Sequence, residues 1–253
     1  MNKLFSVGIV TYNSENVIRN VLDSLEEQVN RADIEIYVID NASTDRTVEI
    51  IEQNYNNVIL IKNAKNLGFG KANNQVIMKV HSKYHVLVNP DITVFSDTFL
   101  KVQNFMDKYP NIVQMSPKVL NKDGTEQYLP KKYPKFKYLI AGKFEEKHSR
   151  FEQLRSEYTR KNERINEFID IDFCTGCFSV LRTNELKKCH GFDERFFLYL
   201  EDADLTREMQ KFGRTVYNPK IEVCHGWERA SGKSFKYFLI HLQSMMKYCY
   251  KWK

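Results

Sequence analysis

At residues 86–91 the chain reads Val-Leu-Val-Asn-Pro-Asp, which places a carboxylate directly after a short apolar run. Such a run is typical of a strand that is buried on both faces. Similar runs precede it at residues 4–10, 34–39 and 58–61, and helical patterns separate them at residues 14–29, 44–54 and 70–80. This alternation predicts βαβ units with right-handed crossovers, and therefore an α/β fold with a mostly parallel sheet.

Polar residues gather where the expected strands end. Asn13 and Ser14 are expected to cap the first helix, and residues 41–45 offer several N-caps for the second, with an acid near its positive end. In open α/β sheets, ligands bind outside the carboxyl ends of the strands. We therefore expect a ligand site at Thr11, at Asp40, and at residues 63–68 and 89–91.

Length and charge limit the class of protein. The 253 residues, of which 42% are hydrophobic, can bury the core of one α/β domain, with or without an appended segment. A net charge of +6 suits a nucleic-acid binder, a protein at an anionic membrane surface, or an enzyme for anionic substrates. Residues 4–10 are too short for a signal peptide, and no apolar stretch reaches the ~20 residues that span a bilayer, so we expect a cytoplasmic protein.

The five cysteines do not form the even set of a secreted disulfide framework. Cys174 and Cys177 have the spacing of a zinc or redox pair, and the Cys-His pairs at residues 189–190 and 224–225 could supply further zinc ligands. The first pair, however, lies in a strand-like run over residues 169–181. We therefore favour reduced, mostly buried thiols.

Two features between residues 40 and 71 concern nucleotides. Asp40 follows an expected strand, where an acid can accept hydrogen bonds from a base or ribose, although capping the next helix explains it equally well. The segment Gly68-Phe69-Gly70-Lys71 matches neither the dinucleotide-binding fingerprint nor a P-loop. We expect its glycines to let the backbone approach a nucleotide, with Lys71 near enough to act electrostatically.

Six segments occur in a characteristic order. They are Val-Thr-Tyr-Asn-Ser at residues 10–14, Val-Ile-Asp-Asn-Ala-Ser-Thr-Asp at 38–45, Asn-Leu-Gly-Phe-Gly at 66–70, Asn-Pro-Asp at 89–91, Gly-Phe-Asp-Glu at 191–194, and Phe-Leu-Tyr-Leu-Glu-Asp-Ala-Asp at 197–204. Over about residues 4–229 the chain thereby resembles glycosyltransferase family 2, and within it bacterial rhamnosyltransferases of cell-surface polysaccharide assembly. The resemblance implies a GT-A (Rossmann-like) fold, a divalent metal, and inversion at the anomeric carbon.

The resemblance also assigns donor-binding roles at the matching positions. Thr11 and Asp40 would hold the nucleoside of a nucleotide-sugar donor, with Tyr12 lining the same entrance. The full set of expected donor-binding residues is Thr11, Tyr12, Asn13, Asp40, Asn66, Gly68, Lys71, Asn89 and Asp91.

A metal, Mg²⁺ or Mn²⁺, is expected at Asp91 on the same basis. Asn89 stands where the family's first carboxylate would be, and Mg²⁺ can use one carboxylate together with substrate phosphates and water. His225 resembles the histidine that completes the coordination in the family. Its alternative is an ordinary, partly buried histidine.

Two acids at the start of a helix expected over residues 200–212 would carry catalysis. Asp202 matches the base that deprotonates the acceptor hydroxyl, and Glu201 would orient the acceptor or tune that base. Acids at this position also interact favourably with the helix dipole, which is our preferred explanation for Asp204.

Residues 123–168 interrupt the pattern and are expected to form a small insertion on the acceptor side of a domain over residues 1–230. Asp123 and Gly124 predict a tight turn, residues 131–138 are basic and aromatic, and residues 145–167 read as a charged surface helix. Residues 231–253 predict a basic, aromatic, amphipathic helix, which would lie on an anionic membrane, pack onto the domain or form a homodimer.

The expected function is metal-dependent, inverting transfer of L-rhamnose from dTDP-rhamnose to a cell-surface polysaccharide or a lipid-linked glycan. A UDP-hexose or UDP-N-acetylhexosamine transferase of the same fold is the first alternative. A protein that binds sugar nucleotides without catalysis, or one that binds nucleic acid, represents another class. Because no DNA- or RNA-binding motif occurs, we expect no nucleic-acid partner. The expected location is the cytoplasm, including the inner face of the cell membrane.

Overall fold

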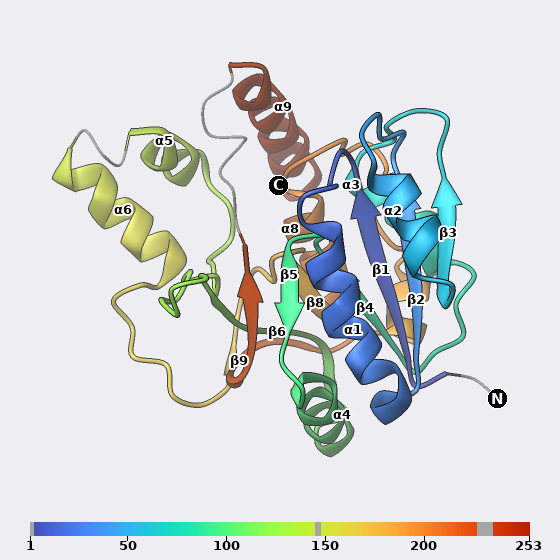
Figure 1. Cartoon of the computed structure of the whole chain (residues 1–253). Helices are drawn as coiled ribbons and strands as arrows, with labels where there is room; N and C mark the ends of the chain where they lie inside the picture. Colours follow the sequence, from blue (N-terminus) through green and yellow to red (C-terminus); the bar gives the residue numbers. More distant parts are fainter. Residues whose placement is uncertain (1–2, 145–147, 227–234) are drawn as a thin grey trace.

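A mixed sheet of nine strands forms the centre of the computed structural model, which describes residues 3–144, 148–226 and 235–253 (Figure 1). The order is β3-β2-β1-β4-β8-β6-β9-β5, and β7 pairs with β9. The strands are β1 (Phe5–Thr11), β2 (Ile34–Asp40), β3 (Val58–Lys62), β4 (Tyr84–Val88), β5 (Ile92–Val94), β6 (Ile112–Leu120), β7 (Ile169–Asp170), β8 (Phe178–Arg182) and β9 (Arg214–His225).

The first four strands pair in parallel, as predicted from the sequence. Beyond β4 the pairing changes, because β8 runs antiparallel to both β4 and β6. Strand β5 also returns antiparallel along β9. Strands β6 and β9 pair in parallel again. The predicted α/β fold with a mostly parallel central sheet is confirmed, and its antiparallel pairings were not visible in the alternation of strands and helices.

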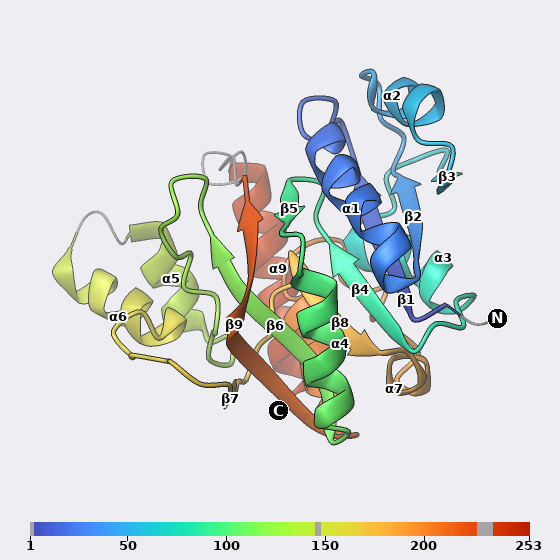
Figure 2. The ribbon, with the colours of Figure 1, turned by 60° about the horizontal axis from the view of Figure 1, so that its bottom comes forward.

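Helices cover both faces of the sheet. They are α1 (Ile18–Ala32), α2 (Thr47–Asn54), α3 (Phe69–Ile77), α4 (Thr98–Lys108), α5 (Phe136–Phe144), α6 (Ser149–Thr159), α7 (Thr183–Lys188), α8 (Glu201–Met209) and α9 (Phe235–Lys251). Figure 2 shows α1 and α4 side by side on one face, over the largest apolar cluster. A second cluster packs α3, α7 and α8 against the other face. Among the described residues, no helix is long and apolar enough to cross a membrane.

The first two helices begin later than predicted. Helix α1 starts at Ile18 rather than at residue 14, and α2 starts at Thr47 rather than at residue 44. Asn13 and Ser14, which were expected to cap α1, instead join the two loops: Asn13 Oδ1 accepts a hydrogen bond from the Thr44 amide at 2.8 Å, and the Ser14 backbone amide donates to Thr47 Oγ1 at 2.7 Å. Asp45, from the segment expected to cap α2, accepts a hydrogen bond from the Thr47 amide at 3.0 Å, where that helix begins.

The insertion contains two helices where we expected one. After β6 and the turn at Asp123-Gly124, helices α5 and α6 pack together (Figure 1). The rings of Tyr138 and Tyr158 stack between them at 4.7 Å. The helix expected over residues 145–167 is shorter, because Arg160 adopts a left-handed conformation after Thr159. Residues 145–147 lie outside the described residues.

Helix α9 packs onto the domain. Its Met245 and Tyr248 are buried against α8 and the insertion. Lys251 forms an ion pair with Asp204 at 2.8 Å, and Trp252 Nε1 donates to the same carboxylate at 2.7 Å. Packing on the domain is thus one of the uses foreseen for the tail. The expected boundary between residues 230 and 231 lies outside the described residues.

Candidate active site

A cavity of about 1060 Å³ lies where the carboxyl end of β4, the insertion and the start of α8 meet. Asn89 lines it after β4, His225 at the end of β9, and Glu201 and Asp202 at the start of α8. The insertion forms the opposite wall. The structure therefore brings together predicted site residues that are up to 136 positions apart in the sequence, from 89 to 225.

The acid pair is held by an unusual turn. Tyr199 and Leu200, at φ 69° and 64°, are both left-handed, a conformation that non-glycine residues adopt rarely. Helix α8 begins directly after them. Asp202 Oδ2 accepts a hydrogen bond from the Gly176 amide at 3.0 Å, and Oδ1 accepts one from the Ala203 amide at 2.9 Å. These amide contacts fix the Asp202 carboxylate at the cavity wall.

The surroundings of the two acids affect their pKa values differently. Glu201 is only 6% exposed, and its Oε2 has no hydrogen-bond partner among the residues that the structure describes. Burial, and the nearby charge of Asp202, raise the pKa of Glu201 well above its usual value. Burial also raises the pKa of Asp202, but the Gly176 amide and the charge of Lys131 oppose that rise. The pair therefore favours a proton on Glu201 and a negative charge on Asp202, which suits a general base.

Asp91 meets His225, which lines the cavity at the end of β9. Strand β5 pairs with β9 so that Ile92 lies opposite His225, which brings the Asp91 Oδ1 to 3.1 Å from His225 Nε2. His225 Nδ1 lies 2.9 Å from Gln127 Oε1, an oxygen that can only accept. With the proton assigned to Nδ1, the Nε2 lone pair faces the carboxylate, and a cation between them removes their repulsion.

This donor set fits a divalent cation. One carboxylate oxygen and one imidazole nitrogen suit Mn²⁺, and the amide oxygen of Gln127 orients the histidine as an outer partner commonly does. Among the described residues, no group of three or more His, Cys, Asp or Glu side chains could hold a metal. The remaining ligands would therefore come from substrate phosphates and water.

The predicted nucleoside residues lie at the ends of β1 and β2. Thr11 pairs in register with Asp40, both are buried, and Thr11 Oγ1 donates to Asp40 Oδ1 at 3.1 Å. Asp40 Oδ2 also accepts from the Ser43 amide at 2.9 Å, so this acid closes a turn rather than capping α2. Tyr12 is 52% exposed beside them. These residues are not part of the cavity wall, and their contact with a nucleotide stays a prediction.

The glycine segment before α3 contacts the protein itself. Gly68 has φ 83°, and a Cβ at this position would overlap the carbonyl oxygen of Phe197. Asn66 Oδ1 accepts from the Gly68 amide at 2.9 Å, and Lys71 forms an ion pair with Glu194 at 2.8 Å. The backbone and side chains of this segment thus approach the loop over residues 192–197, which precedes the acid pair, and the expected approach to a nucleotide stays a prediction.

We expect Gly68→Ala to lower the free energy of unfolding by about 2–4 kcal/mol, because a left-handed alanine and a clash with backbone both cost free energy. Gly124→Ala is the matched control, since Gly124 has nearly the same φ of 82° but no atom within 4 Å of an added Cβ. It should cost only about 1–2 kcal/mol. Chemical denaturation measures both values, and equal losses would show that Phe197 does not crowd Gly68.

The cysteine pair is buried instead of forming a metal site. Cys174 and Cys177 are both buried, and burial raises the pKa of the Cys177 thiol to about 11. Neither Cys-His pair joins them, because the described residues contain no such cluster of ligands. Buried thiols, the interpretation favoured from the sequence, agree with this placement.

Three basic residues in the described part of the insertion line the cavity and were not predicted as site residues. They are Lys131, Arg155 and Lys161. Lys131 belongs to the basic, aromatic run noted in the sequence, which was the available signal. Nothing in the local sequence distinguishes Arg155 from the other charged residues of α6, because its place in the wall depends on how α6 packs.

Comparison with known sequences finds relatives along most of the chain. A sequence model of glycosyl transferase family 2 matches residues 6–189. The N-acetylglucosaminyl-diphospho-decaprenol L-rhamnosyltransferase of Mycobacterium tuberculosis is 25% identical over 249 residues, which cover 92% of this chain and 79% of the relative. Rhamnosyltransferase WbbL of Escherichia coli is 26% identical over 255 residues, covering 95% of this chain and 90% of the relative.

A solved structure with the same fold is the mannosyltransferase PcManGT from Pyrobaculum calidifontis in complex with GDP-Man and Mn²⁺. It has a TM-score of 0.66 and 15% identity, and the match covers 99% of this chain and 65% of that one. At this identity the likeness shows the fold alone, and it confirms the predicted GT-A architecture.

Proposed function

Because this chain belongs to glycosyltransferase family 2, we propose that it transfers L-rhamnose from dTDP-rhamnose, with inversion, to a cell-surface polysaccharide or a lipid-linked glycan. Two of its relatives are rhamnosyltransferases by name, and one name specifies a diphospho-decaprenol acceptor. The observation that carries the catalytic part is the shared cavity of Asn89, His225, Glu201 and Asp202.

In this proposal the donor lies across the carboxyl ends of the parallel strands. Thr11 and Asp40 hold the nucleoside, and the exposed ring of Tyr12 covers it. Asp91 and His225 would hold a divalent cation, which would stabilise the negative charge of the departing diphosphate. These groups lie at or just after the carboxyl ends of the strands, and the sugar would reach from there into the cavity.

Asp202 acts as the general base on the acceptor hydroxyl. Its two amide contacts hold the carboxylate still, and its raised pKa brings its basicity closer to that needed near neutral pH. Glu201 lines the same wall and would orient the acceptor or tune this base, and its own Oε2 is buried without a hydrogen-bond partner among the described residues. In an inverting displacement the base and the leaving group lie on opposite faces of the sugar.

The protein would work in the cytoplasm at the inner face of the membrane, through helix α9. Leu239, Met246 and Tyr250 of this helix are exposed although they are apolar or aromatic, and Lys247 and Lys253 lie beside them in the sequence. A basic amphipathic surface of this kind suits anionic headgroups.

We expect dTDP-rhamnose with Mn²⁺ to raise the melting temperature by about 5–10 °C at saturating concentration, because ligand binding to the folded state stabilises it. UDP-glucose, UDP-galactose and UDP-N-acetylglucosamine should give smaller shifts, and chelation of Mn²⁺ should reduce the first shift. A larger shift with a UDP-sugar would mean that this sugar nucleotide, and not dTDP-rhamnose, is the donor, and the proposal of glycosyl transfer would stand. No shift with any nucleotide sugar would contradict the catalytic proposal.

A further inference from the structure

The turn that leads into the acid pair needs support from the rest of the fold. Tyr199 and Leu200 are both left-handed, at φ 69° and 64°. Two consecutive left-handed residues with side chains cost free energy, and such a conformation persists only where the surrounding structure holds it. Glu201 and Asp202 follow directly, as the first residues of α8. The place of the acid pair in the cavity therefore depends on the contacts made to this turn.

The start of α3 holds the backbone just before the turn. The Phe69 amide donates a hydrogen bond to the Phe197 carbonyl at 3.3 Å. Gly68 lies so close to the same carbonyl that a Cβ would overlap it. These contacts fix the chain at residue 197, and the left-handed residues lie two and three positions beyond it.

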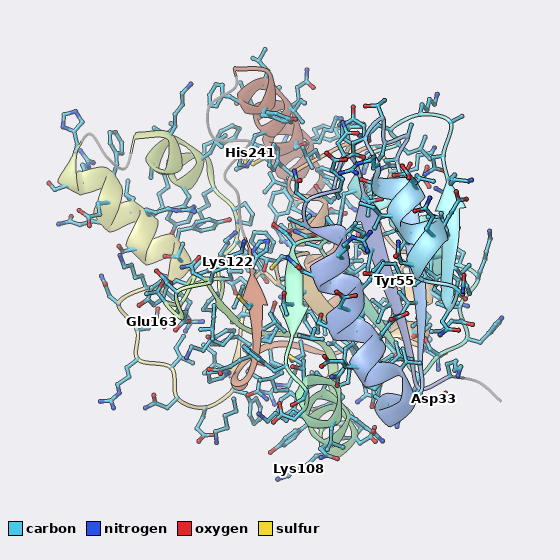
Figure 3. All side chains as sticks on the ribbon, viewed as in Figure 1. Asp33, Tyr55, Lys108, Lys122, Glu163 and His241 are labelled. Atoms are coloured by element: carbon cyan, nitrogen blue, oxygen red, sulfur yellow. The ribbon has the colours of Figure 1, made fainter. Side chains whose placement is uncertain are left out.

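Helix α9 contacts the turn itself. Ser244, which is 2% exposed, donates its hydroxyl to the Leu198 carbonyl at 2.8 Å, and Leu198 lines the cavity. His241, labelled in Figure 3, stacks its ring on that of Tyr199, with the ring centres 4.7 Å apart and the planes at 27°. Because residues three positions apart share a face of a helix, both side chains reach the turn from the same side of α9.

The second left-handed residue is held by apolar packing. Leu200 is buried in a cluster with Met245 and Tyr248 of α9 and with Ala203 of α8. Relaxation of the turn to ordinary φ values would have to disturb this close packing, so the cluster opposes it. The residues of α9 that contact the turn and its cluster share one face of the helix, and the exposed residues proposed to meet the membrane share the opposite face.

The position of Asp202 is sensitive to any such relaxation. Its carboxylate accepts a hydrogen bond from the Gly176 amide at 3.0 Å, and Gly176 lies on a different part of the chain, just before β8. This contact forms only if α8 starts where it does. A general base must lie within hydrogen-bond reach of the hydroxyl that it deprotonates, and a displacement of about 1 Å can lower a rate about 10²-fold.

We propose that Ser244 and His241 of α9 are positioning residues, which hold the turn over residues 198–200 so that Asp202 can reach the acceptor hydroxyl. This inference rests on the proposed role of Asp202 in glycosyl transfer. It adds α9 to the parts of the protein that turnover requires, beyond packing on the domain and contact with a membrane.

The test compares turnover with donor affinity. Ser244→Ala removes the hydroxyl that binds the Leu198 carbonyl, and His241→Ala removes the stacked ring. Each should lower kcat about 10-fold, because the base is displaced, and each should leave the Kd for dTDP-rhamnose with Mn²⁺ unchanged. Ser244→Thr keeps a hydroxyl and His241→Phe keeps a flat ring, so these two variants should recover most of the lost kcat.

Two controls separate the turn contacts from the general docking of α9. Gln243→Ala alters the exposed neighbour of Ser244. Asp204→Asn weakens the ion pair with Lys251 at the end of α9 without changing a side chain that contacts the turn. Both should keep kcat close to the wild-type value. An equal loss of kcat in Asp204→Asn and Ser244→Ala would show that loosening of the whole helix is responsible, and it would overturn the proposal.

Hydrogen exchange of the Gly176 amide, measured by NMR, tests the same hold on Asp202 without any substrate. Exchange should be about 10-fold faster in Ser244→Ala and in His241→Ala than in the wild type, and unchanged in Gln243→Ala. If these differences appear but the wild type transfers no sugar, the proposed function fails and the positioning of Asp202 by α9 stands. An active wild type, with neither kcat nor exchange altered in Ser244→Ala and His241→Ala, would overturn the inference.

Discussion

Replacing Asp202 with Asn should lower the turnover number by about 10²–10⁴-fold while donor affinity stays the same, because the amide cannot accept the acceptor proton. The substitution keeps the shape of the side chain, and its oxygen can still accept the hydrogen bond from the Gly176 amide. Release of nucleoside diphosphate from the donor in the presence of a lipid-linked glycan measures turnover. Calorimetry of the same protein with donor and Mn²⁺ measures the affinity.

Asp204→Asn is the matched control for this experiment. Asp204 is also buried in α8, two residues further on, but it pairs with Lys251 and Trp252 of the tail and does not line the cavity. Its substitution should lower the melting temperature and leave turnover of the folded protein close to normal. A similar loss of turnover in both variants would show that the helix, rather than the Asp202 carboxylate, is responsible.

The pH dependence of turnover gives a second measure of the same group. Burial raises the pKa of Asp202, so its carboxylate takes up a proton at a higher pH than an ordinary aspartate does. Because the base must be ionised, the wild-type rate should fall as the pH drops through that raised pKa. The residual rate of Asp202→Asn should lack this acidic limb, and an unchanged limb would assign it to another group.

Replacing Asp91 with Ala should weaken metal-dependent donor binding by at least ~10²-fold, because it removes the carboxylate from the proposed pair of protein ligands, to which the described part of the chain adds no third His, Cys, Asp or Glu. Calorimetric titration of the nucleotide sugar, with Mn²⁺ and with EDTA, measures this dependence. In the wild type the two titrations should differ strongly, and in the variant they should converge on the weak, metal-free value.

Asp97→Ala controls for the loss of one negative charge nearby in the sequence. Asp97 forms an exposed ion pair with Lys101 at 2.7 Å, and such surface pairs contribute little to stability. This variant should keep the full effect of Mn²⁺. If Asp91→Ala folds normally and still binds the donor more tightly with Mn²⁺ than with EDTA, Asp91 is not the metal ligand.

The local pattern of the first hundred residues was sufficient to predict the parallel half of the sheet. Apolar runs separated by helical periodicity indicate βαβ units, and Asp40 and Asp91 could be placed at or just beyond the carboxyl ends of strands. The helix starts were predicted less well, since Asn13 and Ser14 have the composition of caps but donate and accept across loops. Whether a polar side chain binds its own helix or a neighbouring loop depends on contacts between segments about thirty residues apart.

The sequence by itself determined the family, the parallel strands and which acidic residues are candidates for the site, because residue types and short spacings carry this information. The tertiary structure decided which groups share a cavity. Antiparallel pairing of β5 with β9 brings His225 to Asp91, and the fold of the insertion brings Arg155 and Lys131 to the same Tyr158 ring. It also set the ionisation of Glu201, since a pKa depends on burial and on neighbouring charges that only the folded chain assembles.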